Sequence, residues 1–340
     1  MGMLIDGQWH DIAHATRNGR FERTESVFRH WVTPDGSPGP TGLGGFAAEP
    51  DRYHLYVSLA CPWAHRTTIT RTLKGLKTMV GLSVVHWLMR EKGWTFKPGP
   101  GVVRDPVVNA RYMSEVYVAA DAHYTGRVTV PVLWDKKLRT IVSNESSDIM
   151  RMFNSAFDRI GARACDLRPP SLQQEIDAIS ARVQHSLNNG VYKVGFATNQ
   201  DAYEEALHPL FETLDWLEHK LDAQRFLAGG RLTEADVRLF ATLVRFDAVY
   251  YGHFKCNLRR LQDYPNLSAY ARDIYQIEGI ADTVDFDHIR RHYYESHPAL
   301  NPSGIVPVAA GFDFTAPHGR AHRFARHHGG VAEPLRAAAG

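Results

Sequence analysis

The sequence is short of cysteine, with only three in 340 residues: Cys61, Cys165 and Cys256. Their odd number and wide spacing exclude both a disulfide framework and a cysteine-rich metal cluster. Free cysteines are typical of proteins that work in a reducing compartment. We therefore expect a cytoplasmic protein in which thiol chemistry is available.

Long apolar runs and an excess of one charge are also missing. No stretch approaches the roughly 20 apolar residues that a membrane-spanning helix needs, and the N-terminal MGMLIDGQWHD lacks the features of a signal peptide. Formal net charge is only +2, from 39 Lys and Arg against 37 Asp and Glu, whereas a nucleic-acid-binding surface is strongly basic. We expect a protein that binds neither membranes nor nucleic acid.

Composition divides the chain into four regions. Residues 1–50 are rich in Gly, Pro, Arg and Phe without a sustained period, and are predicted to form an extended arm. Residues 51–160 alternate between strand and helix patterns, and residues 171–300 have a helical period throughout. Residues 301–340 form a C-terminal extension, which is rich in His, Arg, Gly and Ala beyond about 310 and is predicted to be poorly ordered there.

The first half has the pattern of a thioredoxin-like α/β domain. A buried strand, a helix, a second strand, a long excursion, two more strands and a helix follow one another in this order. Pro62 suits the first position of a helix, while Pro131 interrupts the third strand, where a proline would remove a ladder donor. The predicted strands are 53–60, 83–89, 128–135 and 138–144, and the predicted helices are 62–73 and 144–153.

The second half is predicted to be all-helical, because its apolar residues recur three and four apart. Asn189–Gly190 is interpreted as the C-terminal stop of the first of these helices. Thr233 and Asp236 have the spacing of a capping box at the start of the third. The predicted helices are 172–187, 203–221, 232–240, 266–276 and 285–295.

Cys61 stands at the junction of the first strand and the first helix, directly before Pro62. A helix N-terminus stabilises a thiolate, so we expect a lowered pKa and a nucleophilic sulfur. A free cysteine is more often a small buried hydrophobe, and this interpretation suits Cys165 and Cys256. Ala64 stands where a dithiol enzyme has its second cysteine, so a mixed disulfide on Cys61 must be resolved by an outside thiol such as glutathione.

Several motifs resemble those of one family across roughly residues 20 to 320. The stretches SLACPWAHRT, GRVTVPVLWDK, NNGVYKVGFA, LTEADVRLF, HFKCN and HYYESHPALNPSGIVP are similar to the glutathionyl-hydroquinone reductases, the Xi class of the glutathione transferase superfamily. The tyrosine-bearing stretches NNGVY, VYYGHFKCN and HYYESH are specific to this class. The resemblance implies a thioredoxin-like N-terminal domain, an all-helical glutathione-transferase C-terminal domain, and a homodimer.

The resemblance also implies catalytic roles. Cys61 would be the nucleophile and Tyr192 the proton donor, while Tyr250 and Tyr293 would donate hydrogen bonds to the cysteine sulfur and lower its pKa. The neighbouring Tyr251 and Tyr294 leave a one-residue uncertainty at the last two sites.

Glutathione is the implied co-substrate. A cis bond before Pro131 would turn the Val130 backbone outward, to pair with the cysteinyl part of glutathione. Glu145–Ser146 opens a helix whose N-terminus would bind the γ-glutamyl carboxylate, with the Glu145 side chain facing its ammonium group. The residues implied in glutathione binding are Trp94, Arg127, Val128, Val130, Glu145 and Ser146.

The implied activity is reduction of glutathionyl-hydroquinones to hydroquinones, with release of glutathione disulfide through a Cys61–glutathione mixed disulfide. Two alternatives stay open. A monothiol thiol-transferase or dehydroascorbate reductase would need Cys61 but not the tyrosines, and a non-catalytic binding module would need neither. The histidines near the C-terminus have no spacing that indicates a metal site, so no metal is expected.

Overall fold

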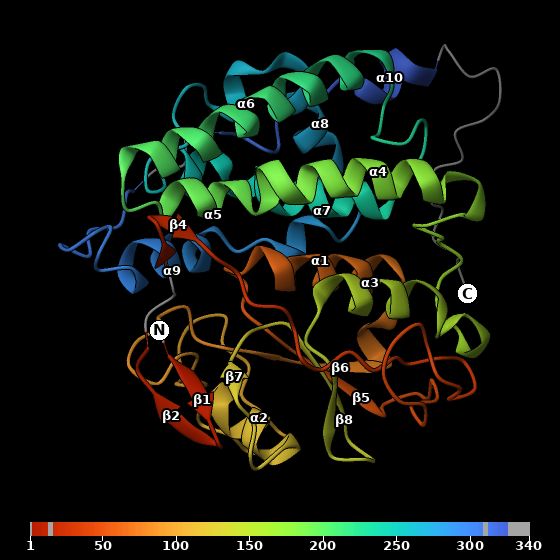
Figure 1. The fold of residues 1–340 in the computed structure, drawn as a ribbon. Coiled ribbons are helices and arrows are strands. Elements are labelled where there is room, and N and C mark those ends of the chain that lie inside the picture. Colours follow the sequence, from red (N-terminus) through yellow and green to blue (C-terminus); the bar gives the residue numbers. More distant parts are fainter. Residues whose placement is uncertain (1, 13–15, 309–311, 326–340) are drawn as a thin grey trace.

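The computed structural model describes residues 2–12, 16–308 and 312–325. A small sheet domain and a larger helical domain lie one above the other, and helices α1 and α3 run between them (Figure 1). Two clusters of buried side chains form the core: one is centred on the sheet, and the other fills the helical domain and includes Ile69 and Leu73 of α1. Within the described ranges, no helix is long and apolar enough to cross a membrane.

The main sheet has four strands in the order β6-β5-β8-β9. Strand β5 pairs with β6 in parallel and with β8 antiparallel, and β8 pairs antiparallel with β9. Every residue of β5 is buried, because both faces of the sheet are covered. The strands are β5 (Tyr53–Val57), β6 (Val80–Val84), β8 (Val132–Asp135) and β9 (Thr140–Ser143).

Two predicted strands differ from the observed ones. The strand expected at 83–89 lies at 80–84, because the chain then leaves the sheet and His292 hydrogen-bonds the carbonyl oxygen of Trp87 at 2.8 Å. The strand expected at 128–135 begins only at Val132, after a cis peptide bond between Val130 and Pro131. Between β6 and β8 the long excursion contains α2 (Met113–Ala120) and β7 (Gly126–Arg127).

Helices α1 (Pro62–Leu73) and α3 (Ser146–Ser155) join the two domains. Helix α1 begins directly after Cys61, with Pro62 in its first turn as the sequence predicts, and all of its residues are buried. Glu145 caps α3, where its carboxylate accepts a hydrogen bond from the Ser147 amide at 3.1 Å. Figure 1 shows that both helices cover the face of the sheet that is turned toward the helical domain.

In the helical domain, one predicted helix end is not observed. Asn189–Gly190 does not end a helix, because Gly190 lacks the left-handed conformation that such a stop requires. Instead α4 continues through a π-helical turn at 184–188 into α5, which Gly190 begins. The helices are α4 (Gln173–Val183), α5 (Gly190–Gly195), α6 (Gln200–Ala223), α7 (Glu234–Arg245), α8 (Pro265–Tyr275) and α9 (Phe286–Ser296).

The capping box predicted for α7 is confirmed. The Thr233 amide donates to the Asp236 carboxylate at 2.8 Å, and the reciprocal bond of the box is also present. Tyr270 of α8 donates a further hydrogen bond to Asp236 at 2.8 Å. This carboxylate therefore fixes both the start of α7 and its contact with α8.

The N-terminal region, expected as an extended arm, contains two short hairpins. One pairs with β7 in a three-stranded antiparallel sheet, and the other reaches across to α5, where β4 lies beside the helix in Figure 1. Arg20 forms an ion pair with Glu205 of α6 at 2.6 Å. The strands are β1 (Met3–Ile5), β2 (Gln8–His10), β3 (Thr16–Arg17) and β4 (Arg20–Phe21).

The C-terminal region is ordered further than its composition indicates. Phe312 and Phe314 are buried in the helical core, and α10 (Arg320–Ala325) packs against α8. The prediction of poor order beyond 310 is therefore wrong for residues 312–325, while residues 326–340 lie outside the described residues.

Candidate active site

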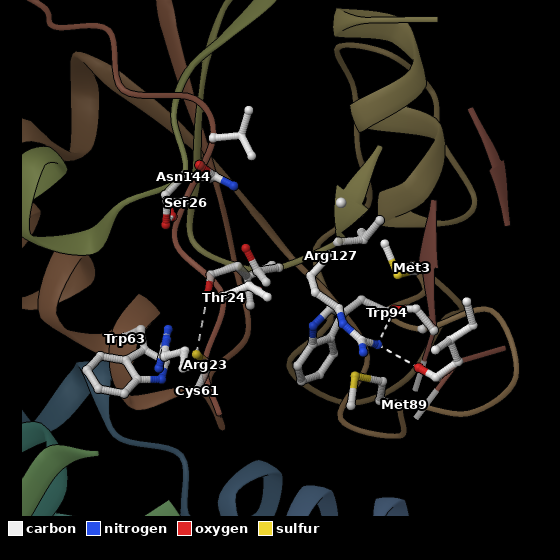
Figure 2. Close-up of a pocket in the computed structure, with 18 of the residues that line it drawn as sticks. Met3, Arg23, Thr24, Ser26, Cys61, Trp63, Met89, Trp94, Arg127 and Asn144 are labelled. Carbon is white, nitrogen blue, oxygen red and sulfur yellow. Dashed lines mark hydrogen bonds between the residues drawn. The ribbon is translucent and has the colours of Figure 1, made fainter. Parts of the chain in front are cut away.

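A cavity of about 620 Å³ opens between the sheet domain and the helical domain, and Cys61 lies in its wall. Figure 2 shows Cys61, Trp63 and Arg23 on one side of this cavity, with Trp94 and Arg127 on the opposite side. The wall is built from the N-terminal arm, the start of α1, the segment from β7 to β8, and helices α5 and α9. The cavity therefore collects groups from both domains around one thiol.

The Cys61 sulfur is fixed by the turn between β5 and α1. Cys61 is the residue before the first helical position, with an extended backbone, and its amide donates to the Ser58 carbonyl at 3.1 Å. The thiol donates to the carbonyl oxygen of Val130 at 3.5 Å, the bond drawn at Cys61 in Figure 2. The side chain remains partly exposed to the cavity.

Burial raises the pKa of the Cys61 thiol, which is opposite to the direction that the sequence predicts. The helix terminus acts as expected, because the backbone N–H groups of Ala64 and Trp63 favour the thiolate, and so do the Arg245 and Arg23 guanidinium groups. The desolvation of the sulfur outweighs them. The sequence shows that Cys61 stands at a helix start, but it does not show how deeply the sulfur is buried.

Three tyrosines from three elements meet beside the cysteine. The Tyr192 hydroxyl lies 2.6 Å from that of Tyr293, which in turn lies 3.1 Å from that of Tyr250. Burial raises the pKa of Tyr192 and of Tyr250, the latter to about 12, and negative charge on Cys61 adds to both shifts. The three phenols therefore form one hydrogen-bonded chain, and burial keeps all three protonated at neutral pH.

The expected hydrogen bonds from Tyr250 and Tyr293 to the sulfur are not among those of the described residues. Their hydroxyls bond to each other, and the thiol bonds to Val130 instead. The neighbouring tyrosines have other surroundings: the Tyr294 ring lies against His253, with centroids 4.6 Å apart, and Tyr251 is partly exposed. Tyr250 and Tyr293 are thus the members of the chain.

Four of the expected glutathione-binding residues line the cavity: Trp94, Arg127, Val128 and Val130. Trp94 stacks on the His292 ring of α9, with centroids 4.7 Å apart. Arg127 donates to the carbonyl oxygens of Gly2 and Ile12, at 3.3 and 2.6 Å, so the arm holds its guanidinium at the cavity (Figure 2). Burial lowers the pKa of Arg127 from its ordinary value.

Glu145 and Ser146 lie at the start of α3, beside Asn144, which lines the cavity. The Glu145 carboxylate accepts hydrogen bonds from the hydroxyls of Ser147 and Ser26, at 2.8 and 3.1 Å. Burial raises the pKa of Glu145, but the hydrogen bonds from Ser147 together with the charges of Arg23 and Arg66 outweigh it, and the pKa lies below its ordinary value. An ionised carboxylate therefore stands at this helix start, one residue from the cavity wall.

Sequence reasoning missed the part of the arm that lines the cavity. Phe21 stacks on Phe196 and Tyr192, with centroids 5.4 and 6.4 Å apart. The Arg23 guanidinium lies 4.0 Å from the ring centre of Trp63, and that ring also stacks on Tyr192. The richness of residues 1–50 in Phe and Arg was the available signal, but without a period it indicated no position.

A second missed residue is Arg245, which lies behind the cysteine and contacts the loop before it. Nothing in its neighbourhood in the sequence distinguishes it from a solvated charge at a helix end.

As to metals, the described part of the chain contains no group of three or more His, Cys, Asp or Glu that could hold an ion.

The fold and the site together define a glutathione transferase in which a cysteine occupies the start of α1. Family models agree: the glutathione S-transferase N-terminal domain matches residues 60–156, and the C-terminal domain matches residues 200–273. The predicted fold class, thioredoxin-like α/β followed by all-α, is thereby confirmed.

Comparison with individual proteins is more specific. The chain is 57% identical over 327 residues to the glutathionyl-hydroquinone reductase YqjG of Escherichia coli K12, covering 95% of this chain and all of YqjG. It is 55% identical to the glutathionyl-hydroquinone reductase PcpF of Sphingobium chlorophenolicum, over 91% of this chain and 96% of PcpF.

Solved structures that are similar to this chain come from the same family of proteins. The glutathione-bound structure of YqjG superimposes with a TM-score of 0.89 at 55% identity, covering 95% of this chain and 100% of that one. A Xi class enzyme from Natrialba magadii gives a TM-score of 0.87 at 48% identity, over 95% and 97% of the two chains. The chain belongs to the glutathionyl-hydroquinone reductases, the Xi class of the glutathione S-transferase family.

Proposed function

We propose that this chain reduces glutathionyl-hydroquinones to hydroquinones at the expense of glutathione, releasing glutathione disulfide. The observation that carries the proposal is a single thiol in the wall of the cavity together with two phenols of that wall, Tyr192 and Tyr293, which are hydrogen-bonded to each other and, through Tyr293, to the buried Tyr250. The names of the relatives, and glutathione in the YqjG structure, support the reaction and the co-substrate. The cavity, about 620 Å³ and lined by several aromatic rings, suits an aryl conjugate.

The reaction proceeds by covalent catalysis at Cys61. The thiolate attacks the glutathione sulfur of the conjugate, so that a sulfur–sulfur bond forms and the bond from that sulfur to the aryl carbon breaks. The electron pair of the broken bond stays on the carbon, which takes a proton from the Tyr192 hydroxyl and gives the hydroquinone. Tyr293, 2.6 Å from Tyr192, donates a hydrogen bond to the oxygen that loses its proton.

Cys61 then carries a mixed disulfide with glutathione. A second glutathione thiolate attacks the glutathione sulfur of this disulfide, which releases glutathione disulfide and returns the Cys61 thiolate. Ala64 leaves no internal thiol at the position of a resolving cysteine. The net reaction consumes one conjugate and one glutathione, and it yields one hydroquinone and one glutathione disulfide.

Glutathione occupies the side of the cavity formed by the sheet domain. The backbone at Val130 pairs with its cysteinyl part, and Trp94, Arg127 and Val128 contact the rest of the peptide. Glu145 and Ser146 receive the γ-glutamyl end at the start of α3, where backbone N–H groups attract a carboxylate. In this pose the glutathione sulfur lies between Cys61 and the tyrosine chain.

One alternative, a general thiol-transferase, needs Cys61 but not the tyrosines, and it is tested by Tyr192→Phe. On a glutathione mixed disulfide of a small thiol, no carbon needs a proton, so this variant should turn over within about twofold of the wild type. On a glutathionyl-hydroquinone it should lose roughly 100-fold or more, because general acid catalysis contributes about 10²–10⁴-fold.

Tyr294→Phe is the matched control, because Tyr294 lies outside the phenol chain. It should leave both activities unchanged. Equal loss on both substrates in Tyr192→Phe, or wild-type activity on both, would contradict the assignment of Tyr192 as proton donor. Turnover of the mixed disulfide but not of the glutathionyl-hydroquinone by the wild type would favour the thiol-transferase.

We also propose that the protein works as a cytoplasmic homodimer, with a thioredoxin-like domain at 51–160 and a helical domain at 171–300. The three cysteines are free thiols, which supports a reducing compartment. Sedimentation at micromolar concentration would test the dimer, because the proposal predicts about twice the mass of one 38.3 kDa chain.

A further inference from the structure

Arg245, the last residue of α7, is fully buried behind the catalytic loop. Its Nε donates to the Ala60 carbonyl at 2.8 Å, and its Nη2 donates to the Leu59 carbonyl at 3.0 Å. Its Nη1 donates to the Ala241 carbonyl at 2.7 Å and lies 3.0 Å from Nδ1 of His65. One guanidinium thus ties the helical domain to the two peptide groups that precede Cys61.

The partners of this cation are all neutral. Two other buried guanidinium groups, Arg52 and Arg238, contact the carboxylates of Asp135 and Glu234. Arg245 contacts carbonyl oxygens and His65, and it belongs to none of the ion pairs among the described residues. A buried charge without an opposite charge is costly. Arg71 and Arg320 are likewise buried and donate to carbonyl oxygens, so what distinguishes Arg245 is that its carbonyl partners include the two residues directly before Cys61.

We propose that Arg245 is a positioning residue for the reaction: it fixes the loop that carries Cys61 and supplies the buried positive charge that offsets the thiolate. This inference rests on the proposed function, in which Cys61 is the nucleophile. The charge of Arg245 also acts to lower the pKa values of Cys61, Tyr250 and Tyr293, against the larger effect of burial.

Other titratable and charged groups face this region from the surrounding elements. The cations Arg23 and Arg66 both lie over the Trp63 ring, at 4.0 and 4.4 Å from its centre. Neither hydrogen-bonds a peptide group of the catalytic loop in the described ranges. The groups that interact electrostatically with Cys61 or Arg245 are Arg23 of the arm, His65 and Arg66 of α1, Tyr192 of α5, Tyr250 after α7, and His292 and Tyr293 of α9.

Two substitutions separate the charge of Arg245 from its geometry. Arg245→Gln retains donors for the loop carbonyls but removes the charge, and Arg245→Lys retains the charge with fewer donors. The matched control is Arg320→Gln, because Arg320 is equally buried and donates to the carbonyls of Leu221, Gln224 and Arg225, away from the cavity. All variants are checked for folding by circular dichroism and thermal unfolding.

The measurement is the rate of Cys61 alkylation by iodoacetamide between pH 6 and 10, followed by peptide mass spectrometry. In Arg245→Gln the Cys61 pKa should rise by about one unit, so that alkylation at pH 7 slows about tenfold, since a nearby opposite charge shifts a pKa by about one to three units. Arg245→Lys should keep the wild-type pKa but lower kcat severalfold. Arg320→Gln should lose stability without changing the alkylation profile.

A folded Arg245→Gln with the wild-type alkylation profile would overturn the charge role, and so would an equal shift in Arg320→Gln. If Arg245→Gln does not fold, Arg245→Lys decides, because wild-type kcat in that variant would overturn the positioning role. Alkylation needs no substrate, so its result is independent of the proposed reaction. The proposed function is tested separately: it fails if the wild type does not turn over glutathionyl-hydroquinones, and the role of Cys61 as nucleophile fails if Cys61→Ser does.

Discussion

Replacing Tyr293 by Phe tests the phenol chain at its middle member. The Tyr293 hydroxyl lies 2.6 Å from that of Tyr192 and 3.1 Å from that of Tyr250, so the substitution removes both hydrogen bonds while leaving the ring in place. Its bond to Tyr192 acts to lower the pKa of Tyr192, against burial. In the proposed mechanism Tyr192 releases its proton to carbon, and the bond from Tyr293 would then be made to a developing phenolate.

The magnitude follows from that change of charge. A hydrogen bond to a charged group contributes about 1.5–3 kcal/mol, and each 1.36 kcal/mol is tenfold in rate. Loss of the bond should therefore slow hydroquinone release by about 10- to 150-fold. The free energy of unfolding should also fall by about 1 kcal/mol, because the buried Tyr250 hydroxyl loses its hydrogen bond to Tyr293 and keeps only its interaction with Tyr192.

The assay is single-turnover release of hydroquinone from a glutathionyl-hydroquinone, with folding followed by urea titration. Tyr294→Phe serves as the control, since the neighbouring ring packs against His253 and not in the chain. It should remain within about twofold of the wild type. A Tyr293→Phe variant that releases hydroquinone at the wild-type rate would refute the reasoning, and so would an equal loss in the control.

Three further predictions concern the nucleophile, the buried histidines and the arm. Cys61→Ser should abolish reduction of aryl conjugates with the fold intact, because the serine hydroxyl is not ionised near neutral pH; substantial remaining turnover would exclude a thiolate mechanism. Burial lowers the pKa values of His54, His253 and His292 to about 4, below the unfolded value near 6.5. The free energy of unfolding should therefore be highest above about pH 6.5 and fall as the pH drops toward 4. At pH 5 the loss should be up to about 2 kcal/mol for each histidine. A free energy of unfolding that stays constant across this pH range in urea titrations would contradict the prediction. Phe21→Ala removes the ring that stacks on the cavity aromatics, so KM for aryl conjugates should rise severalfold while KM for a small mixed disulfide changes little; equal changes for both substrates would place the ring outside the aryl site.

The local signals in the sequence specify much of the fold. Pro62 after Cys61 sets the start of α1, and the Thr233–Asp236 box sets the start of α7. The signal at Asn189–Gly190 failed, because a π-helical turn carries the chain into α5 and Gly190 adopts a helical conformation. Single-residue stop signals are weak where tertiary packing covers both sides of the boundary.

The site was predictable where its residues stand in recognisable motifs and not where it depends on burial. Cys61 and Tyr192 were identified from their motifs, and the structure brings both to one cavity. The direction of the Cys61 pKa shift was not predictable, because desolvation depends on how closely the folded chain packs around the sulfur. Arg245 and the lining by Phe21 depend on long-range packing, which no local pattern encodes.

The central claim is a covalent Cys61–glutathione intermediate, and intact-mass spectrometry tests it most directly. Enzyme mixed with a glutathionyl-hydroquinone in the absence of free glutathione should stall with one glutathione attached, located at Cys61 by peptide mapping and removed when glutathione is added. Ala64 provides no thiol to release it from within the motif. Product formation with Cys61 unmodified, or with Cys61 in a disulfide with Cys165 or Cys256, would contradict the account.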